Sequence, residues 1–209
     1  MRAFSDEFRR ELEDLMRWRR DVRRFRRDPV PDDLTRACLD AARLAPSVGL
    51  SEPWRFVRVA SDAARLAVLN NFKTENATAL SGYTGDLAET YADLKLSGMQ
   101  EAPLQFAVFC DDETAKGHGL GAGTMPEMRR YSVVTAVMNV WLAARAAGLG
   151  VGWVSILDPD QLASDLSAEP GWSLVAYLCM GWPEEEHLEP ELSRAGWEDR
   201  SEALKIWER

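Results

Sequence analysis

The sequence predicts a single α+β domain in which helices and strands alternate along the chain. The first indication is size, because 209 residues of which 46% are hydrophobic can bury the core of one ordinary domain. The second is periodicity, since segments with apolar residues at helical spacing alternate with short apolar segments that suit strands. The sequence contains neither an internal repeat nor a low-complexity linker. We therefore expect one domain over residues 1–209.

Two helices are predicted at the N-terminal end. Ser5 can cap the first helix, and apolar residues recur at helical spacing from Phe8 to about Trp18. Pro31 marks the start of the second helix, which must end before Pro46 because proline interrupts a helix interior. An arginine-rich turn connects the two helices.

A strand, a polar helical segment and a second strand are predicted next. Residues 54–59 alternate between apolar and polar types, as expected for a half-buried strand. Residues 62–100 are polar and only weakly amphipathic, and Gly82-Tyr83-Thr84-Gly85 divides them into two pieces. We interpret this segment as a mobile cover. Pro103 introduces the next strand, residues 104–110.

A long helix and two further strands complete the predicted core. The helix spans about residues 126–147, and its apolar side chains from 133 to 147 occupy nearly every face. We expect it to be buried on all sides, with a second subunit as one candidate for the cover. Residues 150–157 predict a strand and a turn, Asp158-Pro159 starts a short helix, and the continuous apolar segment 174–180 predicts a central strand.

Charge is distributed unevenly along the chain. The net charge of −9 disfavours general binding to nucleic acid. Residues 1–27 nevertheless hold ten arginines against six acidic residues, a local net charge of +4. A basic cluster on an acidic protein predicts a site for one localised anion.

Compartment and assembly are the next expectations. The three cysteines, Cys38, Cys110 and Cys179, are dispersed and odd in number, and no leader pattern opens the chain, so a reducing cytoplasm is expected. The longest strongly apolar stretch is shorter than the roughly 20 residues of a spanning helix, so we expect no membrane segment. The charged tail, residues 183–209, carries two tryptophans and needs a surface to pack against, for which a partner subunit is one candidate.

Three motifs could carry chemistry. Arg19-Arg20-Asp21-Val22-Arg23-Arg24-Phe25 offers several guanidinium groups that match phosphate oxygens, although a solvated turn is the alternative. The loop from Pro46 to Trp54 contains small residues that allow close approach to a ligand, or it simply connects two elements. Gly148-Leu149-Gly150-Val151-Gly152-Trp153-Val154-Ser155 follows a helix and leads into a strand, the reverse of a phosphate-binding glycine fingerprint.

Self-contained catalytic groups are scarce in the sequence. Its two histidines, His118 and His187, are far apart, and no spacing of cysteine or histidine predicts a metal site or a hydrolytic triad. A chain of this kind either binds a molecule or uses a cofactor.

Together, the three motifs resemble the flavin-binding segments of the FMN-dependent nitroreductase superfamily. Further segments are similar to the 5,6-dimethylbenzimidazole synthase (BluB) family, and the resemblance covers about residues 15–200. These segments are Leu94-Lys95-Leu96, Thr124-Met125-Pro126-Glu127, Val151 to Pro159, Ala176 to Pro183, and Pro190 to Trp197.

The resemblance implies a reaction and an architecture. The reaction is the oxygen-dependent fragmentation of reduced FMN, which is both cofactor and substrate, to 5,6-dimethylbenzimidazole, the lower ligand of cobalamin. The architecture is a three-layer α/β/α sandwich with a mixed central sheet. Two copies form a homodimer with exchanged C-terminal arms, residues 183–209, and the flavin lies near their interface. Residues 74–99 form a lid that excludes nicotinamide and admits O2, and a separate flavin reductase is one candidate for the electron source.

The resemblance also assigns the site. Asp21 and Ser155 match the catalytic pair, and no metal is implied. The implied FMN-binding residues are Arg19, Arg20, Asp21, Val22, Arg23, Ser47, Gly152, Trp153, Val154, Ser155 and Arg194. Flanking arginines should keep Asp21 ionised, whereas burial against the flavin should have the opposite effect. Leu50, Glu52 and Ala122-Gly123 depart from the family pattern, which predicts fewer polar contacts with the flavin ring.

Two other function classes are open at this level. One is an NAD(P)H-dependent FMN reductase acting on nitro compounds or quinones, in which a small polar residue is usual at the position of Asp21. The other is a non-enzymatic nucleotide-binding or RNA-binding module built on the arginine cluster. The net charge of −9 and the lack of aromatic residues among the arginines argue against the second.

Overall fold

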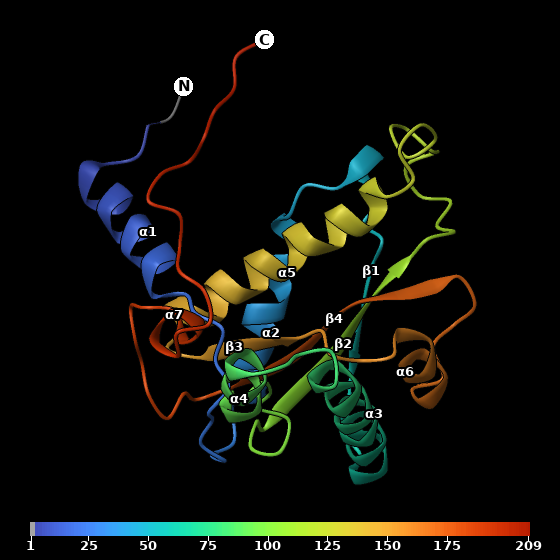
Figure 1. Ribbon diagram of the computed structural model, residues 1–209. Coiled ribbons are helices and arrows are strands. Elements are labelled where there is room, and N and C mark those ends of the chain that lie inside the picture. The colour runs from blue at the N-terminus through green and yellow to red at the C-terminus, as the bar shows by residue number, and fades with distance from the viewer. Residues whose placement is uncertain (1–2) are drawn as a thin grey trace.

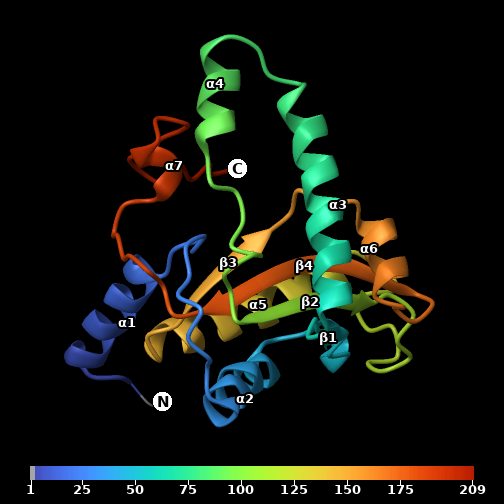
Figure 2. The same cartoon turned by 90° about the horizontal axis from the view of Figure 1, so that it is seen from below.

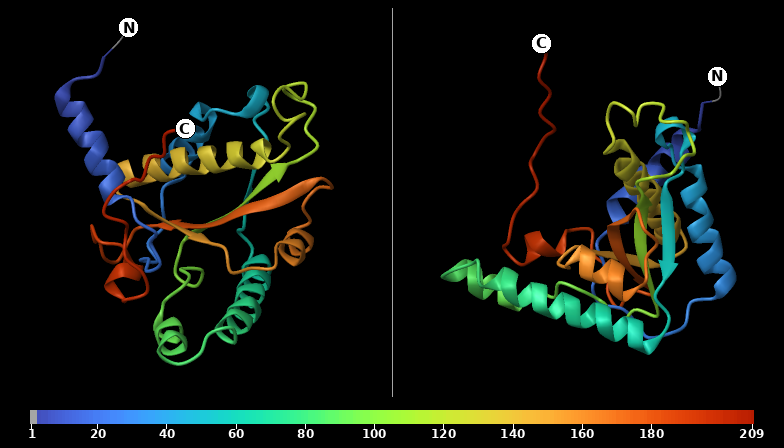
Figure 3. Two further views of the ribbon diagram at one scale, coloured as in Figure 1. Left: turned by 45° about the horizontal axis from the view of Figure 1, so that its top comes forward. Right: turned by 90° about the vertical axis from the view of Figure 1, so that its right-hand side faces the viewer.

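A four-stranded sheet lies between two layers of helices in the computed structural model, which describes residues 3–209 (Figures 1 and 3). Arg2, one of the arginines counted above, lies outside the described residues. The strands are β1 (Trp54–Arg58), β2 (Leu104–Asp111), β3 (Gly150–Val154) and β4 (Trp172–Gly181). The expected three-layer α+β architecture is confirmed.

The strand order is β1-β2-β4-β3, and each neighbouring pair is antiparallel. Among the described residues, parallel pairing occurs only at an isolated bridge between Asp21 and Val151. The resemblance implied a mixed sheet, whereas all four strands are antiparallel to their neighbours. Hydrophobic periodicity predicts strands but does not predict their direction. β2 and β4 are the two central strands, as expected for the continuous apolar segment 174–180.

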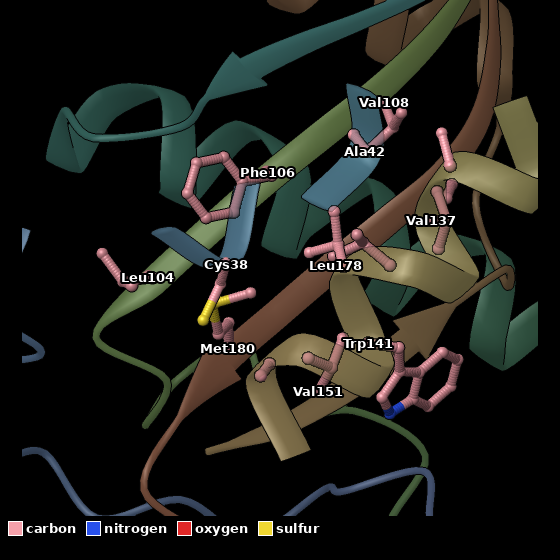
Figure 4. Packing of buried hydrophobic residues seen from close by; sticks show 14 of the residues in the cluster. Cys38, Ala42, Leu104, Phe106, Val108, Val137, Trp141, Val151, Leu178 and Met180 are labelled. Carbon is pink, nitrogen blue, oxygen red and sulfur yellow. The ribbon is translucent and has the colours of Figure 1, made fainter. Parts of the chain in front are cut away.

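One face of the sheet is covered by α2 (Asp32–Asp40) and α5 (Met128–Ala146), as Figure 1 shows. Figure 4 shows Val137 and Trp141 of α5 directed toward the sheet. The buried residues of this cluster include Cys38, Ala42, Leu104, Phe106, Val108, Val151, Leu178 and Met180. α1 (Asp6–Trp18) contacts α5 and contains no buried residue.

The opposite face carries α3 (Asp62–Leu80) and α6 (Pro159–Asp165), whose Val68, Phe72 and Leu162 pack on the sheet. α3 continues beyond the sheet to α4 (Asp86–Asp93), and the two helices project from the rest of the domain (Figure 3). α7 (Glu191–Arg194) lies beside α4 in Figure 2. The predicted break at Gly82 to Gly85 thus separates α3 from α4.

Local sequence signals account for the helix ends. The Ser5 side chain accepts a hydrogen bond from the backbone N–H of Phe8 at 3.2 Å. Asp158 caps α6 by accepting from two backbone N–H groups, with Pro159 in the first turn. Gly148, with a φ of 80°, lies just after α5, in the left-handed region that glycine adopts readily.

The prediction that α5 is buried on all sides is wrong for the single chain. Tyr131, Val134 and Met138 remain exposed on one stripe, the last two with 39% of their surface accessible. The sheet and α2 cover only part of the helix, because a helix has more faces than two layers can contact. In the described part of the chain, no helix combines the length and apolar character needed to cross a membrane.

Candidate active site

The arginine-rich segment lies along the free edge of β3. Asp21 bridges to Val151, and the N–H of Val22 donates to the carbonyl of Val151 at 3.0 Å. A Cβ on Gly152 would collide with the carbonyl oxygen of Val22, and one on Gly150 would lie 2.7 Å from a Val22 methyl. The two glycines therefore allow the segment to approach the strand, which explains their position after the helix end.

Asp21 is held by two donors at this edge. Its Oδ1 accepts from the backbone N–H of Trp153 at 2.8 Å, and its Oδ2 accepts from Nε of Arg23 at 2.9 Å. Burial raises the pKa of Asp21 above its ordinary value, because loss of hydration outweighs the opposing effects of Arg23 and the Trp153 N–H. About a third of the side chain, 34%, still reaches solvent. Of the two opposing effects expected from the sequence, burial therefore has the larger influence on the pKa of Asp21.

Arg23 contacts the Asp21 carboxylate and the segment predicted to be a lid. Besides its bond to Asp21, its Nη1 donates to the carbonyl oxygen of Lys95 at 3.1 Å. Its side chain is only 12% exposed. Arg23 therefore joins Asp21 to the end of the segment 74–99.

Arg19 and Arg20 border a second feature, a pocket of about 150 Å³ beside Asp21. The guanidinium of Arg19 lies over the ring of Trp141 at 4.7 Å, and Nε of Arg20 donates to the carbonyl of Leu188 at 2.6 Å. Burial and the nearby charge of Arg200 lower the pKa of both Arg19 and Arg20. Converging cations that repel one another form a site suited to an anion.

Arg200 was not predicted from the sequence. It lines the same pocket as Arg19 and Arg20, although it is 180 residues from them along the chain. In the sequence, Arg200 is an isolated arginine three residues after Trp197, in a tail rich in acidic residues. No pattern there indicates that it belongs to a site. Arg194, which was predicted, lines a neighbouring pocket with Glu185 and His187 and does not border the pocket of Arg19 and Arg200.

The end of β3 carries the remaining predicted residues. Trp153 packs near Trp141, with ring centroids 6.4 Å apart, and the Val154 side chain is buried in the core. Ser155 is exposed and follows the strand directly. It lies two residues beyond Trp153, a rise of about 6 to 7 Å along a strand. Ser155 therefore follows, by two residues, the backbone N–H of Trp153 that holds Asp21.

Ser47 is not brought to this cluster within one chain. Its Oγ accepts from the N–H of Glu52 at 3.2 Å, and its loop is held to the first turns of α5 through Ser132. Arg19 contacts α5 at Trp141, nine residues later, which corresponds to about 14 Å of helix. Leu50 and Glu52 in this loop have positive φ angles of 56° and 42°.

The chain has close relatives and a known fold. The sequence profile of the Nitroreductase family matches residues 16–182. The chain is 54% identical over 197 residues to the 5,6-dimethylbenzimidazole synthase of Rhodospirillum rubrum, covering 94% of this chain and 93% of the relative. It is 48% identical over 199 residues to the 5,6-dimethylbenzimidazole synthase of Rhodobacter capsulatus, covering 94% and 95%.

Among solved structures, iodotyrosine deiodinase bound to FMN and 3-iodo-L-tyrosine is similar with a TM-score of 0.76 and 23% identity, covering 95% of this chain and 99% of that one. This likeness supports the fold alone. The profile match and the two sequence relatives support the family. The chain belongs to the nitroreductase family and, within it, to the 5,6-dimethylbenzimidazole synthases.

Proposed function

We propose that the chain catalyses the oxygen-dependent fragmentation of reduced FMN to 5,6-dimethylbenzimidazole, the lower ligand of cobalamin. The observation that carries this assignment is Asp21, a carboxylate fixed by Trp153 N–H and Arg23 beside a pocket of arginines. A carboxylate at this place can accept a proton from a bound ligand, which a reductase that only passes hydride does not require.

The arginine pocket fits the phosphate of FMN. Arg19, Arg20 and Arg200 supply guanidinium donors around one space, and their mutual repulsion would be relieved by a dianion. The guanidinium of Arg19 makes a cation–π contact with the ring of Trp141. Arg23 and residues 152–155, at the end of β3 and just after it, would then border the flavin ring. When bound, reduced FMN supplies the electrons and the ring atoms from which the product forms, and O2 is the co-substrate.

Asp21 is the proposed proton acceptor. Its raised pKa brings proton affinity closer to neutral pH, and a base is most effective when its pKa lies near the working pH. The two donors on Asp21 fix the direction of its oxygens, so the carboxylate need not reorient during the reaction. Ser155, an exposed residue two positions after Trp153, is the proposed second proton carrier.

The working unit is proposed to be a homodimer. Tyr131, Val134 and Met138 form an exposed apolar stripe on α5, and the arm from residue 183 ends in exposed side chains such as Trp207. We propose residues 74–99 as the lid over the flavin, and a separate flavin reductase as the source of reduced FMN.

The fate of the flavin tests the assignment against an NAD(P)H-dependent nitroreductase. The purified chain is given reduced FMN in air, and total flavin is measured before and after. The synthase consumes flavin and does not use NADH or NADPH steadily with nitro or quinone acceptors. Steady nicotinamide consumption with all flavin recovered would establish the reductase instead.

A further inference from the structure

An aromatic cluster joins the lid to the C-terminal arm. Tyr83 and Tyr91 stack with ring centroids 4.9 Å apart, and Trp197 meets Tyr83 edge-on at 5.4 Å and Tyr91 at 6.0 Å. Tyr91 is 6% exposed, and its hydroxyl donates to Oδ1 of Asn76 on α3 at 2.8 Å. Figure 2 shows the two segments, α4 and α7, side by side.

Trp197 is presented by the end of α7. Gly196, with a φ of 72°, lets the chain turn after the helix, and the N–H of Trp197 donates to the carbonyl of Leu192 at 2.9 Å. The N–H of Gly196 donates to Ser193 at 3.0 Å, which completes a regular helix end. The ring is therefore carried on a defined backbone and meets the lid at a defined place.

The same backbone forms one wall of the arginine pocket. Glu191 and Leu192 line the pocket before Trp197, and Arg200 lines it three residues after. The start of α7 is fixed to the arginine segment, since Nη1 of Arg24 contacts Glu191 at 2.6 Å. Within residues 3–209, no ion pair or hydrogen bond holds the Arg200 side chain, and residues 201–209 are exposed. Trp197 is half-buried and contacts the two tyrosines of the lid three residues before Arg200, and Oγ of Ser193 donates to the carbonyl oxygen of Glu198 at 3.1 Å between them.

We propose that Trp197 is a positioning residue that fixes Arg200 at the phosphate pocket and joins phosphate binding to the position of the lid. The inference rests on the proposed function in taking this pocket as the FMN phosphate site. Without Trp197, the arm loses its contact with Tyr83 and Tyr91, and Arg200 is free to leave the pocket. Conversely, a phosphate bound by Arg200 restrains the arm, and the arm restrains the lid.

The test compares two probes that differ by one phosphate. Trp197→Leu should weaken FMN binding about ten-fold and leave riboflavin binding within two-fold, because only FMN engages Arg200. Trp197→Phe should restore most of the affinity for FMN, since a phenyl ring can still contact the two tyrosines. Trp207→Leu, in the exposed end of the same arm, is the matched control and should bind both probes normally.

Two further measurements separate positioning from general stability. The double variant Trp197→Leu/Arg200→Gln should bind FMN no more weakly than Arg200→Gln alone, since Trp197 acts through Arg200. Saturating FMN should protect the amides of residues 83–91 from hydrogen exchange in the unsubstituted chain and not in Trp197→Leu. Equal weakening of FMN and riboflavin, additive effects in the double variant, or unchanged lid protection would each overturn the proposal.

The experiment stays decisive if Trp197→Leu does not fold. Tyr83→Leu removes the same ring contact from the side of the lid. It should also weaken FMN binding about ten-fold and leave riboflavin binding within two-fold. Failure of the proposed function has a different signature, since FMN would then bind with the expected dependence on Trp197 while no dimethylbenzimidazole forms. Failure of the inference leaves product formation intact and removes the difference between the two probes.

Discussion

Replacing Asp21 by Asn changes the two oxygens of the proposed base unequally. The amide oxygen of Asn can still accept the hydrogen bond from Trp153 N–H. Its NH2 group then faces Nε–H of Arg23, so two donors meet where an ion pair existed. The substitution therefore removes the base and one charge-assisted hydrogen bond together.

The structural cost of this change is limited by a compensating gain. Loss of a hydrogen bond to a charged group costs about 1.5 to 3 kcal/mol. The variant no longer buries a carboxylate, and that burial is the main cause of the raised pKa of Asp21. Arg23 keeps its bond to the carbonyl of Lys95. We expect the free energy of unfolding to change by less than about 2 kcal/mol, since the two effects have opposite signs. Loss of a general base should lower the rate of product formation about 100-fold to 10,000-fold.

The assay measures dimethylbenzimidazole by chromatography, with bound FMN determined in the same sample. Asp21→Asn should bind FMN and oxidise it in air while forming almost no product. Because the proposed base must be ionised, the rate of the unsubstituted chain should rise with pH through a value above the ordinary aspartate pKa of about 3.9. Product formation by Asp21→Asn at the unsubstituted rate would refute the role of this carboxylate.

The contribution of Asp21 to the stability of the fold should decrease as pH rises. A raised folded-state pKa means that the folded chain binds the proton of Asp21 more tightly than the unfolded chain does. Below about pH 3.9 both states are protonated and this contribution to stability is complete. As pH rises through the folded pKa it is lost, so Asp21→Asn should gain stability relative to the unsubstituted chain over that window. Urea unfolding at several pH values checks this, and an opposite trend would contradict the raised pKa.

Other substitutions test the surrounding structure. Arg200→Gln should weaken FMN binding about 5-fold to 30-fold, an effect of about 1 to 2 kcal/mol, whereas the exposed Arg27→Gln should not; equal titration curves would remove Arg200 from the site. Gly152→Ala should destabilise the fold by about 1 to 3 kcal/mol and abolish product formation, because the added methyl collides with the Val22 carbonyl. An unchanged melting temperature would contradict the close approach at β3. Met138→Glu should shift a sedimenting dimer toward monomer by placing a charge in the apolar stripe of α5, and a dimer that persists would exclude that stripe from the interface.

Much of the fold could be predicted because its signals are local. Ser5, Asp158 and Gly148 mark helix ends through their own hydrogen bonds or φ angles, and the structure confirms each. Strand direction could not be predicted, because pairing joins residues far apart in sequence. The exposed stripe at Val134 and Met138 could not be predicted either. The apolar composition of the helix does not show which of its faces other parts of the chain cover.

The candidate site was predictable where its residues are contiguous. Asp21 and Val22 meet Val151 and Trp153 at the free edge of β3, and both segments were singled out in the sequence as short continuous motifs. Arg200 reaches the pocket only through the path of the arm, and no sequence pattern specifies that path. The preference of Arg23 for Asp21 and Lys95 over solvent also depends on tertiary contacts.

The most direct measurement is the yield of 5,6-dimethylbenzimidazole when the purified chain is incubated with excess chemically reduced FMN in air. The account predicts that each FMN lost appears as one molecule of dimethylbenzimidazole, and that Ser155→Ala and Asp21→Asn return the flavin mainly as oxidised FMN. Quantitative recovery of oxidised FMN by the unsubstituted chain, with no dimethylbenzimidazole detected by mass, would contradict the account.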